Sequence, residues 1–219
     1  MSQQNAEAQN NVGVKYANGE GVPQDHHRAV KLFRQAANQG LADAQSNLGL
    51  MYTSGEGVPE DRNEAMKLFR QAANQGLADA QNNLGLMYTI GEGVREDHKE
   101  ATKWFHLAAD QGHAEAQYNL GVAYDNGLGV PEDHKETLKW YRLAANQGYA
   151  AAQYNLGVMY RNGEEIPEDD KEAVKWFRLA ADQGYASAQY NLGSRRAEST
   201  CVPEDNQLGY RWSSIVREN

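Results

Sequence analysis

A block of nine residues returns along the chain at a fixed interval of 36 residues. Successive copies read AQNNVGVKY, AQSNLGLMY, AQNNLGLMY, AQYNLGVAY and AQYNLGVMY. The same interval separates five glycines and six aspartates: Gly40, Gly76, Gly112, Gly148 and Gly184, and Asp25, Asp61, Asp97, Asp133, Asp169 and Asp205. A period of this length without insertions is typical of proteins built from stacked supersecondary units. We therefore expect one domain over residues 1–219, with copies at 6–41, 42–77, 78–113, 114–149, 150–185 and 186–219.

Each copy predicts a pair of helices. In the fourth copy the first helix is expected from Ala114 to about Tyr124, because Ala116, Leu120 and Tyr124 recur at four-residue spacing on one buried face. The segment 126–131 then breaks the helix, since it contains glycines and a proline.

The second helix of this copy is predicted to begin after Asp133, whose carboxylate can cap the free N–H groups of the first turn. Glu136, three residues later, is expected to complete a capping box. Gly148 can adopt the left-handed conformation that ends a helix, and Tyr149 follows as a hydrophobic clasp.

One such pair cannot bury its own apolar face, but six stacked pairs make a continuous core. The residues therefore predict an all-α solenoid, in which small side chains such as those of Gly121 and Ala144 allow close stacking. The last copy departs from the pattern, and either a solubilising cap or simple decay of the repeat explains this. Its departures are Arg195, Arg196, Ser213 and Arg217, where the fifth copy has Met159, Tyr160, Phe177 and Ala181.

The shared pattern A-x-A-Q-x-N-L-G-x-x-Y-x-x-G-x-G-V-P-E-D, followed by K-W-F/Y and A-A-x-Q-G, resembles the Sel-one-like repeat (SLR) family. These repeats are relatives of the tetratricopeptide repeats, and the resemblance covers nearly the whole chain. It implies a right-handed α/α superhelical solenoid of helix-turn-helix repeats. It also implies adaptor or scaffold roles in signalling, protein quality control, or bacterial host-interaction and toxin-immunity systems. A cysteine-rich branch has been linked to penicillin binding, but the chain lacks those cysteines and any Ser-x-x-Lys or Lys-Thr-Gly motif.

By the same resemblance, the first helix of each pair lines a concave surface. On a helical wheel, Tyr118, Val122 and Asp125 lie opposite the face that carries Leu120 and Tyr124. The equivalent positions in the six copies are Asn10, Ser46, Asn82, Tyr118, Tyr154 and Tyr190; Val14, Leu50, Leu86, Val122, Val158 and Ser194; and Ala17, Thr53, Thr89, Asp125, Arg161 and Ala197. We expect a groove with an apolar midline, small polar side chains toward its N-terminal end and tyrosines toward its C-terminal end.

The strongest contacts with a partner are predicted at Tyr118, Tyr154 and Tyr190, because tyrosine offers a large flat surface and a hydroxyl at little entropic cost. The remaining predicted partner-binding residues are Val122, Val158, Asp125, Arg161, Leu50 and Leu86. The alternative is that the tyrosines pack against the adjacent repeat. Trp104, Trp140, Trp176 and Trp212 are predicted to pack in the core or on the convex side.

The formal net charge of -9 disfavours nucleic acid and anionic membrane surfaces as partners. No apolar run approaches the ~20 residues of a membrane helix. Cys201 is the single cysteine, so no intrachain disulfide is expected.

The polar N-terminus shows no signal peptide. This predicts a cytoplasmic protein as the sequence is written, or a periplasmic or secreted one if a leader has been removed.

No catalytic, metal or cofactor site is predicted. His26, His98 and His134 follow capping aspartates in separate copies, and stacked helices lie ~8–10 Å apart, too far for shared metal ligation. His106 and His113 are closer in sequence but belong to different elements, so we expect no zinc site there. Cys201 has no neighbouring base that would make it a nucleophile.

The leading hypothesis is therefore a non-enzymatic protein–protein interaction scaffold that binds a partner protein or peptide along the concave face. A second hypothesis is an immunity or inhibitor protein that occludes a toxin or an enzyme, with the acidic charge steering a basic partner. A third, a cell-wall or β-lactam hydrolase, lacks any visible site. The open first repeat predicts either a monomer or weak end-to-end self-association.

Overall fold

Over the residues that the structure describes, the chain folds into five consecutive helix pairs and one further helix. The structure is a computed structural model, and it describes residues 3–194. Within these residues there are eleven helices and no strand: α1 (Gln3–Asn18), α2 (His26–Ala37), α3 (Ala42–Ser54), α4 (Arg62–Asn74), α5 (Ala78–Ile90), α6 (His98–Asp110), α7 (Ala114–Asn126), α8 (His134–Asn146), α9 (Ala150–Asn162), α10 (Asp170–Asp182) and α11 (Ala186–Ser194). The predicted all-α class is confirmed. We call the odd-numbered helices A helices and the even-numbered ones B helices.

The predictions for the end of the last copy fall outside the described residues. They are the choice between a cap and decay of the repeat, the departures at Arg195, Arg196, Ser213 and Arg217, the packing of Trp212 and the thiol of Cys201.

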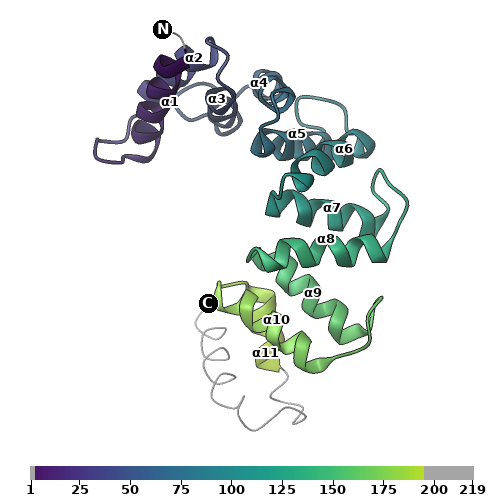
Figure 1. Cartoon of the computed structure of the whole chain (residues 1–219). Coiled ribbons are helices and arrows are strands. Elements are labelled where there is room, and N and C mark those ends of the chain that lie inside the picture. The colour runs from purple at the N-terminus through teal and green to yellow at the C-terminus, as the bar shows by residue number, and fades with distance from the viewer. Residues whose placement is uncertain (1–2, 195–219) are drawn as a thin grey trace. The chain divides into compact units, whose positions relative to one another are not determined.

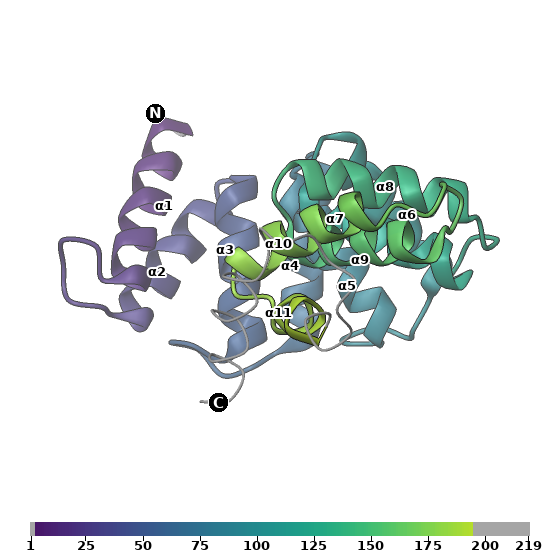
Figure 2. The ribbon, with the colours of Figure 1, turned by 90° about the horizontal axis from the view of Figure 1, so that it is seen from below.

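The helices form two compact units, which we call unit 1 (α1–α6) and unit 2 (α7–α11). The boundary between them falls between His113 and Ala114. Within each unit, every helix packs against the helix before it and the helix after it in the chain (Figure 1; Figure 2). Packing between nearest neighbours along the chain is what defines a solenoid.

An aspartate caps each described B helix. At α8, Asp133 accepts hydrogen bonds from the backbone N–H groups of Lys135 and Glu136, at 3.0 and 3.1 Å. The predicted second half of the capping box is wrong, because the Asp133 N–H donates to the Tyr124 carbonyl at 3.0 Å. The Glu136 carboxylate instead accepts bonds from the Lys139 ammonium and the Trp140 indole N–H, at 2.8 and 2.9 Å.

The turn that ends α8 agrees with the predicted glycine terminus and hydrophobic clasp. Gly148 has a φ of 90°, in the left-handed region that favours glycine. The Tyr149 N–H donates to the Ala144 carbonyl at 3.1 Å, and the Tyr149 ring packs against the core cluster that contains Ala144. Local sequence thus specifies both ends of the helix.

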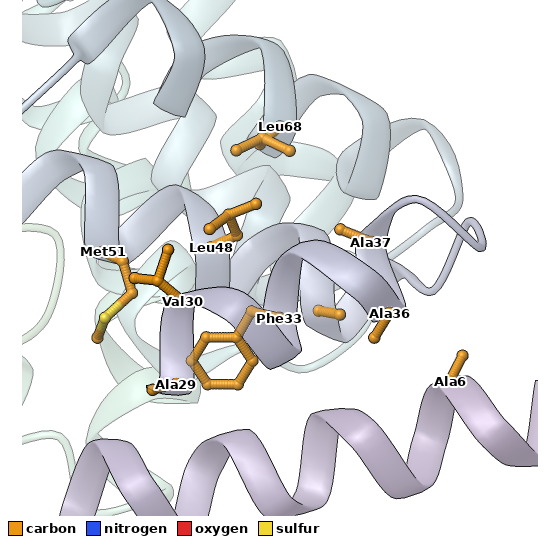
Figure 3. Packing of buried hydrophobic residues seen from close by; sticks show 10 residues of the cluster. Ala6, Ala29, Val30, Phe33, Ala36, Ala37, Leu48, Met51 and Leu68 are labelled. Carbon is orange, nitrogen blue, oxygen red and sulfur yellow. The ribbon is translucent and has the colours of Figure 1, made fainter. Parts of the chain in front are cut away.

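A glycine of each A helix in repeats 1–5 lies against an aromatic ring of the paired B helix. A Cβ atom added to Gly13 would stand 2.7 Å from Cε1 of Phe33, closer than any carbon side chain tolerates. Figure 3 shows the core of the first repeat, where Phe33 points from α2 toward α1. The other pairs are Gly49 with Phe69, Gly85 with Phe105, Gly121 with Tyr141, and Gly157 with Phe177. The glycine therefore sets how closely the two helices of a repeat approach.

Buried glutamines connect successive helices. Gln81 on α5 accepts a bond from the Gln111 side chain at 2.7 Å and donates one to the Ala73 carbonyl of the preceding repeat at 3.2 Å. Gln153 makes the same pair of bonds in unit 2, with Gln183 at 2.8 Å and with the Ala145 carbonyl at 3.1 Å. We call this series of bonds the glutamine ladder. It satisfies amides that would otherwise be buried without a partner.

Candidate protein-interaction surface

The A helices of unit 2 carry the tyrosine-rich part of the predicted site. We call this set the unit 2 A-helix face; its residues are Tyr118, Val122 and Asp125 on α7, Tyr154, Val158 and Arg161 on α9, and Tyr190 on α11. Six of these side chains are half-buried, and Tyr190 is 64% exposed. The face is therefore partly accessible along its described length.

Two of the tyrosines, Tyr118 and Tyr154, pack against aromatic rings of their own repeats. The Tyr118 ring centroid lies 5.7 Å from that of Tyr141 on α8 and 5.1 Å from that of Tyr149 in the next turn. Tyr154 repeats this arrangement with Phe177 at 5.7 Å and Tyr185 at 5.3 Å. Packing against the core thus fixes part of each ring, while the ring keeps some accessible surface.

An asparagine links neighbouring A helices in unit 2. The Asn191 side-chain amide of α11 donates to the Tyr154 hydroxyl at 3.3 Å, and Asn191 Oδ1 accepts a bond from the Arg161 guanidinium at 3.5 Å. Arg161 also lies over the Phe177 ring, 5.7 Å from its centroid. Two predicted site residues of repeat 5 are thereby oriented by one residue of repeat 6.

Sequence reasoning overlooked this asparagine, although a signal for it was present. An asparagine stands at the same position in all six copies: Asn11, Asn47, Asn83, Asn119, Asn155 and Asn191. In unit 1 the Asn47 amide donates to the Asn10 side chain at 3.0 Å, the same step from one A helix to the next.

Asp125 is paired within its own repeat. His134 Nδ1 lies 3.5 Å from the Asp125 carboxylate, and His134 Nε2 lies 3.0 Å from that of Glu132. Burial raises the pKa of the Asp125 carboxyl above its ordinary value, and the charge of His134 opposes this effect. Asp125 therefore contacts His134 of its own repeat while it belongs to the face.

The predicted residues of unit 1 divide into exposed and covered ones. Leu50 is 46% exposed and Leu86 is half-buried. Asn10, Ser46 and Asn82, expected to line the groove as small polar side chains, are buried instead. The wheel of an isolated helix gives the direction of a side chain but does not reveal that the next repeat covers it. The structure does not describe the side chains at the sixth-copy positions, Ser194 and Ala197.

Four of the histidines considered as metal ligands, His26, His98, His113 and His134, lie near carboxylates. His98 lies 3.0 Å from Glu96, and His113 lies 3.2 Å from Asp79. Among residues 3–194, no group of three or more His, Cys, Asp or Glu side chains is arranged to hold a metal ion. None of the helices in that range is both long enough and apolar enough to cross a membrane.

The tyrosine cluster of unit 2 predicts a loss of stability at alkaline pH. Burial raises the pKa of the Tyr118, Tyr141 and Tyr149 hydroxyls above the ordinary value of 10.0. The stability contributed by the neutral phenols is complete below pH 10.0 and is lost as the pH rises through the folded-state values. We expect urea unfolding to show unit 2 weakening above pH 10.0, and less so in Tyr141→Phe, which keeps the ring. An equal alkaline loss in that variant would contradict this origin.

Paired helices that pack on their neighbours along the chain define an α-helical repeat protein. The family model described as Sel1 repeat matches residues 6–41, 42–77, 78–113, 114–149, 150–185 and 186–214. The chain belongs to the Sel1 repeat family. The first five matched segments coincide with the copies expected from the sequence.

Solved structures of the same fold include a protective antigen of uropathogenic Escherichia coli, at 37% identity and a TM-score of 0.84. The match covers 96% of this chain and 46% of the antigen, so the chain spans less than half of that protein. A Sel1 repeat protein from Oxalobacter formigenes is 32% identical, with a TM-score of 0.87 and coverages of 97% and 85%.

An immunity protein from Pseudomonas aeruginosa shares the fold at 23% identity and a TM-score of 0.64, with coverages of 98% and 81%. A search of the curated proteins found no significant match.

Proposed function

We propose that the chain is a non-enzymatic protein-binding module, and that the unit 2 A-helix face holds a segment of its partner. The Sel1 repeat scaffold fits a role in protein–protein interaction. The observation that carries the finer proposal is the row of tyrosines that are anchored on one side and accessible on the other. Side chains that are already ordered lose little entropy when a partner binds.

The chemistry of the face suggests what the partner segment presents. Val122 and Val158, four residues after Tyr118 and Tyr154 on the same helices, offer apolar contacts. Asp125 and Arg161 add a negative and a positive group that can fix the register of a polar or charged segment. In unit 1, Leu50 and Leu86 are proposed to offer apolar contacts of their own.

The double substitution Tyr154→Ala and Tyr190→Ala tests this proposal. Hot-spot residues contribute more than about 1 kcal/mol each, so we expect the dissociation constant to rise roughly 30-fold. The partner is first identified by affinity capture from the native organism, and its affinity for purified protein is then measured by titration calorimetry.

The control is the double substitution Leu143→Ala and Leu179→Ala, on the B helices of repeats 4 and 5 in the same unit. These leucines are 41% and 42% exposed, and they lie outside the proposed face. We expect their removal to leave affinity unchanged. Full affinity in the folded tyrosine variant, or an equal loss in the leucine variant, would refute the assignment of the face.

Inhibition of a basic toxin or enzyme is the second candidate function. The formal net charge of -9 favours it, because complementary charge accelerates encounter with a basic partner. The Pseudomonas immunity protein shares only the fold with this chain, so the candidate rests on charge alone. A single stoichiometric partner whose activity disappears on binding would favour this function over a general scaffold.

A further inference from the structure

A groove in unit 1 lies between α2 and the loop that joins α3 to α4. It has a volume of about 700 Å³ and shares no residue with the surface described above. Its apolar lining includes Val30, Val58 and Pro59, and its polar lining includes Lys31 and Arg34. The groove therefore combines an apolar wall with two permanent cations.

The loop is held firmly against α2. Gly57 has a φ of 69°, and a Cβ atom added to it would stand 2.4 Å from the His26 carbonyl carbon. The His27 ring nitrogen Nδ1 lies 2.9 Å from the Gly57 carbonyl oxygen, within hydrogen-bond distance. The two walls of the groove are thus fixed relative to each other before any ligand arrives.

Lys31 differs from its counterparts in the other B helices. In those helices the lysine pairs with a glutamate three residues earlier: Lys67 with Glu64, Lys103 with Glu100, Lys139 with Glu136, and Lys175 with Glu172. In α2 the glutamate is replaced by Arg28, which pairs with Asp25. Lys31 makes no hydrogen bond or ion pair with any residue that the structure describes.

The acids next to the groove lie closest to groups other than Lys31 and Arg34. Glu56 lies 3.6 Å from His26, a pair that carries opposite charges when His26 is protonated. Glu60 lies 2.7 Å from the Arg62 guanidinium. Arg34 donates one bond to a tyrosine hydroxyl, that of Tyr52 at 3.0 Å, and this bond leaves its charge uncompensated.

We propose that this groove binds an acidic peptide segment of a partner protein, with a carboxylate held by Lys31 and Arg34. An apolar side chain next to that carboxylate packs against Val58 and Pro59. Charge complementarity selects this occupant, since the groove is locally cationic in a chain of net charge -9. The Debye length of ~8 Å at physiological salt limits repulsion from distant acids. The site does not depend on the unit 2 A-helix face.

The test measures fluorescence anisotropy with a fluorescein-labelled hexapeptide of alternating valine and glutamate, titrated with the full chain. The same peptide with glutamine in place of glutamate is expected to bind at least about tenfold more weakly. Lys31→Gln should weaken binding of the glutamate peptide about fivefold. Arg28→Glu should weaken it similarly, because Lys31 then gains the partner that its counterparts have.

Lys67→Gln, at the equivalent position of repeat 2, is the matched control and should leave binding unchanged. Circular dichroism verifies that each variant is folded. Absence of saturable binding, equal affinity for the two peptides, or equal effects of Lys31→Gln and Lys67→Gln would overturn the proposal. Displacement by inorganic phosphate as effective as that by unlabelled peptide would also overturn it, since the groove would then be a site for small anions. The Tyr154→Ala and Tyr190→Ala variant should bind the peptide normally, so this test and that of the A-helix face fail independently.

Discussion

Replacing Phe177 with alanine is expected to lower the free energy of unfolding by about 3–5 kcal/mol. The ring is fully buried between α9 and α10, where it lies on Gly157 and against Tyr154. Removing it leaves a cavity, because two packed helices cannot collapse into the vacated space without losing their other contacts. Urea unfolding followed by circular dichroism measures the change.

The control for this substitution is Leu179→Ala, two residues further along α10. Leu179 is 42% exposed, so its removal should change the free energy of unfolding by no more than about 0.5 kcal/mol. Equal destabilisation by the two variants would mean that helix content, rather than the buried ring, stabilises this repeat.

The second large effect is expected from Gly85→Val. A Cβ atom at this position would stand 2.5 Å from Cε1 of Phe105, so a side chain must push the ring or the helix aside. Overpacking of this kind costs about 1–3 kcal/mol, and we expect a loss at the upper end, ~2–3 kcal/mol, because valine adds two further methyl groups. Thermal unfolding measured by calorimetry provides the test.

The same substitution at Gly193 is the control, since this glycine occupies the equivalent position of repeat 6. The sequence has Ser213 where the other copies have the ring, and no described atom lies within 4 Å of a Cβ atom added at Gly193. Because valine is at least as favourable as glycine in a helix, Gly193→Val should leave stability unchanged or slightly raised. A loss as large as that of Gly85→Val would show that the ring contact is not the cause.

Sequence alone predicted the helix pairs because their ends are encoded locally. Asp133 caps a helix and Gly148 terminates one through interactions that span only a few residues. The repeat period then extended that prediction to every copy. The capping box failed in part, because the Asp133 N–H finds its acceptor at Tyr124, in the preceding helix.

The candidate site was harder to predict, since it depends on distances between helices. The helical wheel placed Ser46 and Asn82 on a surface, but the structure buries both. It also gave no indication that Tyr118 rests on the Tyr141 ring, a contact between two helices. Sequence periodicity gives the direction in which a side chain points, whereas the depth of its burial depends on what packs above it.

The glutamine ladder has a consequence for how arrays of this kind change in length. The rung at Gln81 joins a glutamine of the A helix, the glutamine that follows the B helix of the same copy, and a carbonyl of the copy before, as its bonds with Gln111 and Ala73 show. Recombination that inserts or deletes 36 residues therefore leaves every rung complete, whereas loss of a single helix strands a buried amide, at a cost of about 1–3 kcal/mol. Such genes can grow or shrink in evolution by whole copies, and the buried amides penalise any smaller step.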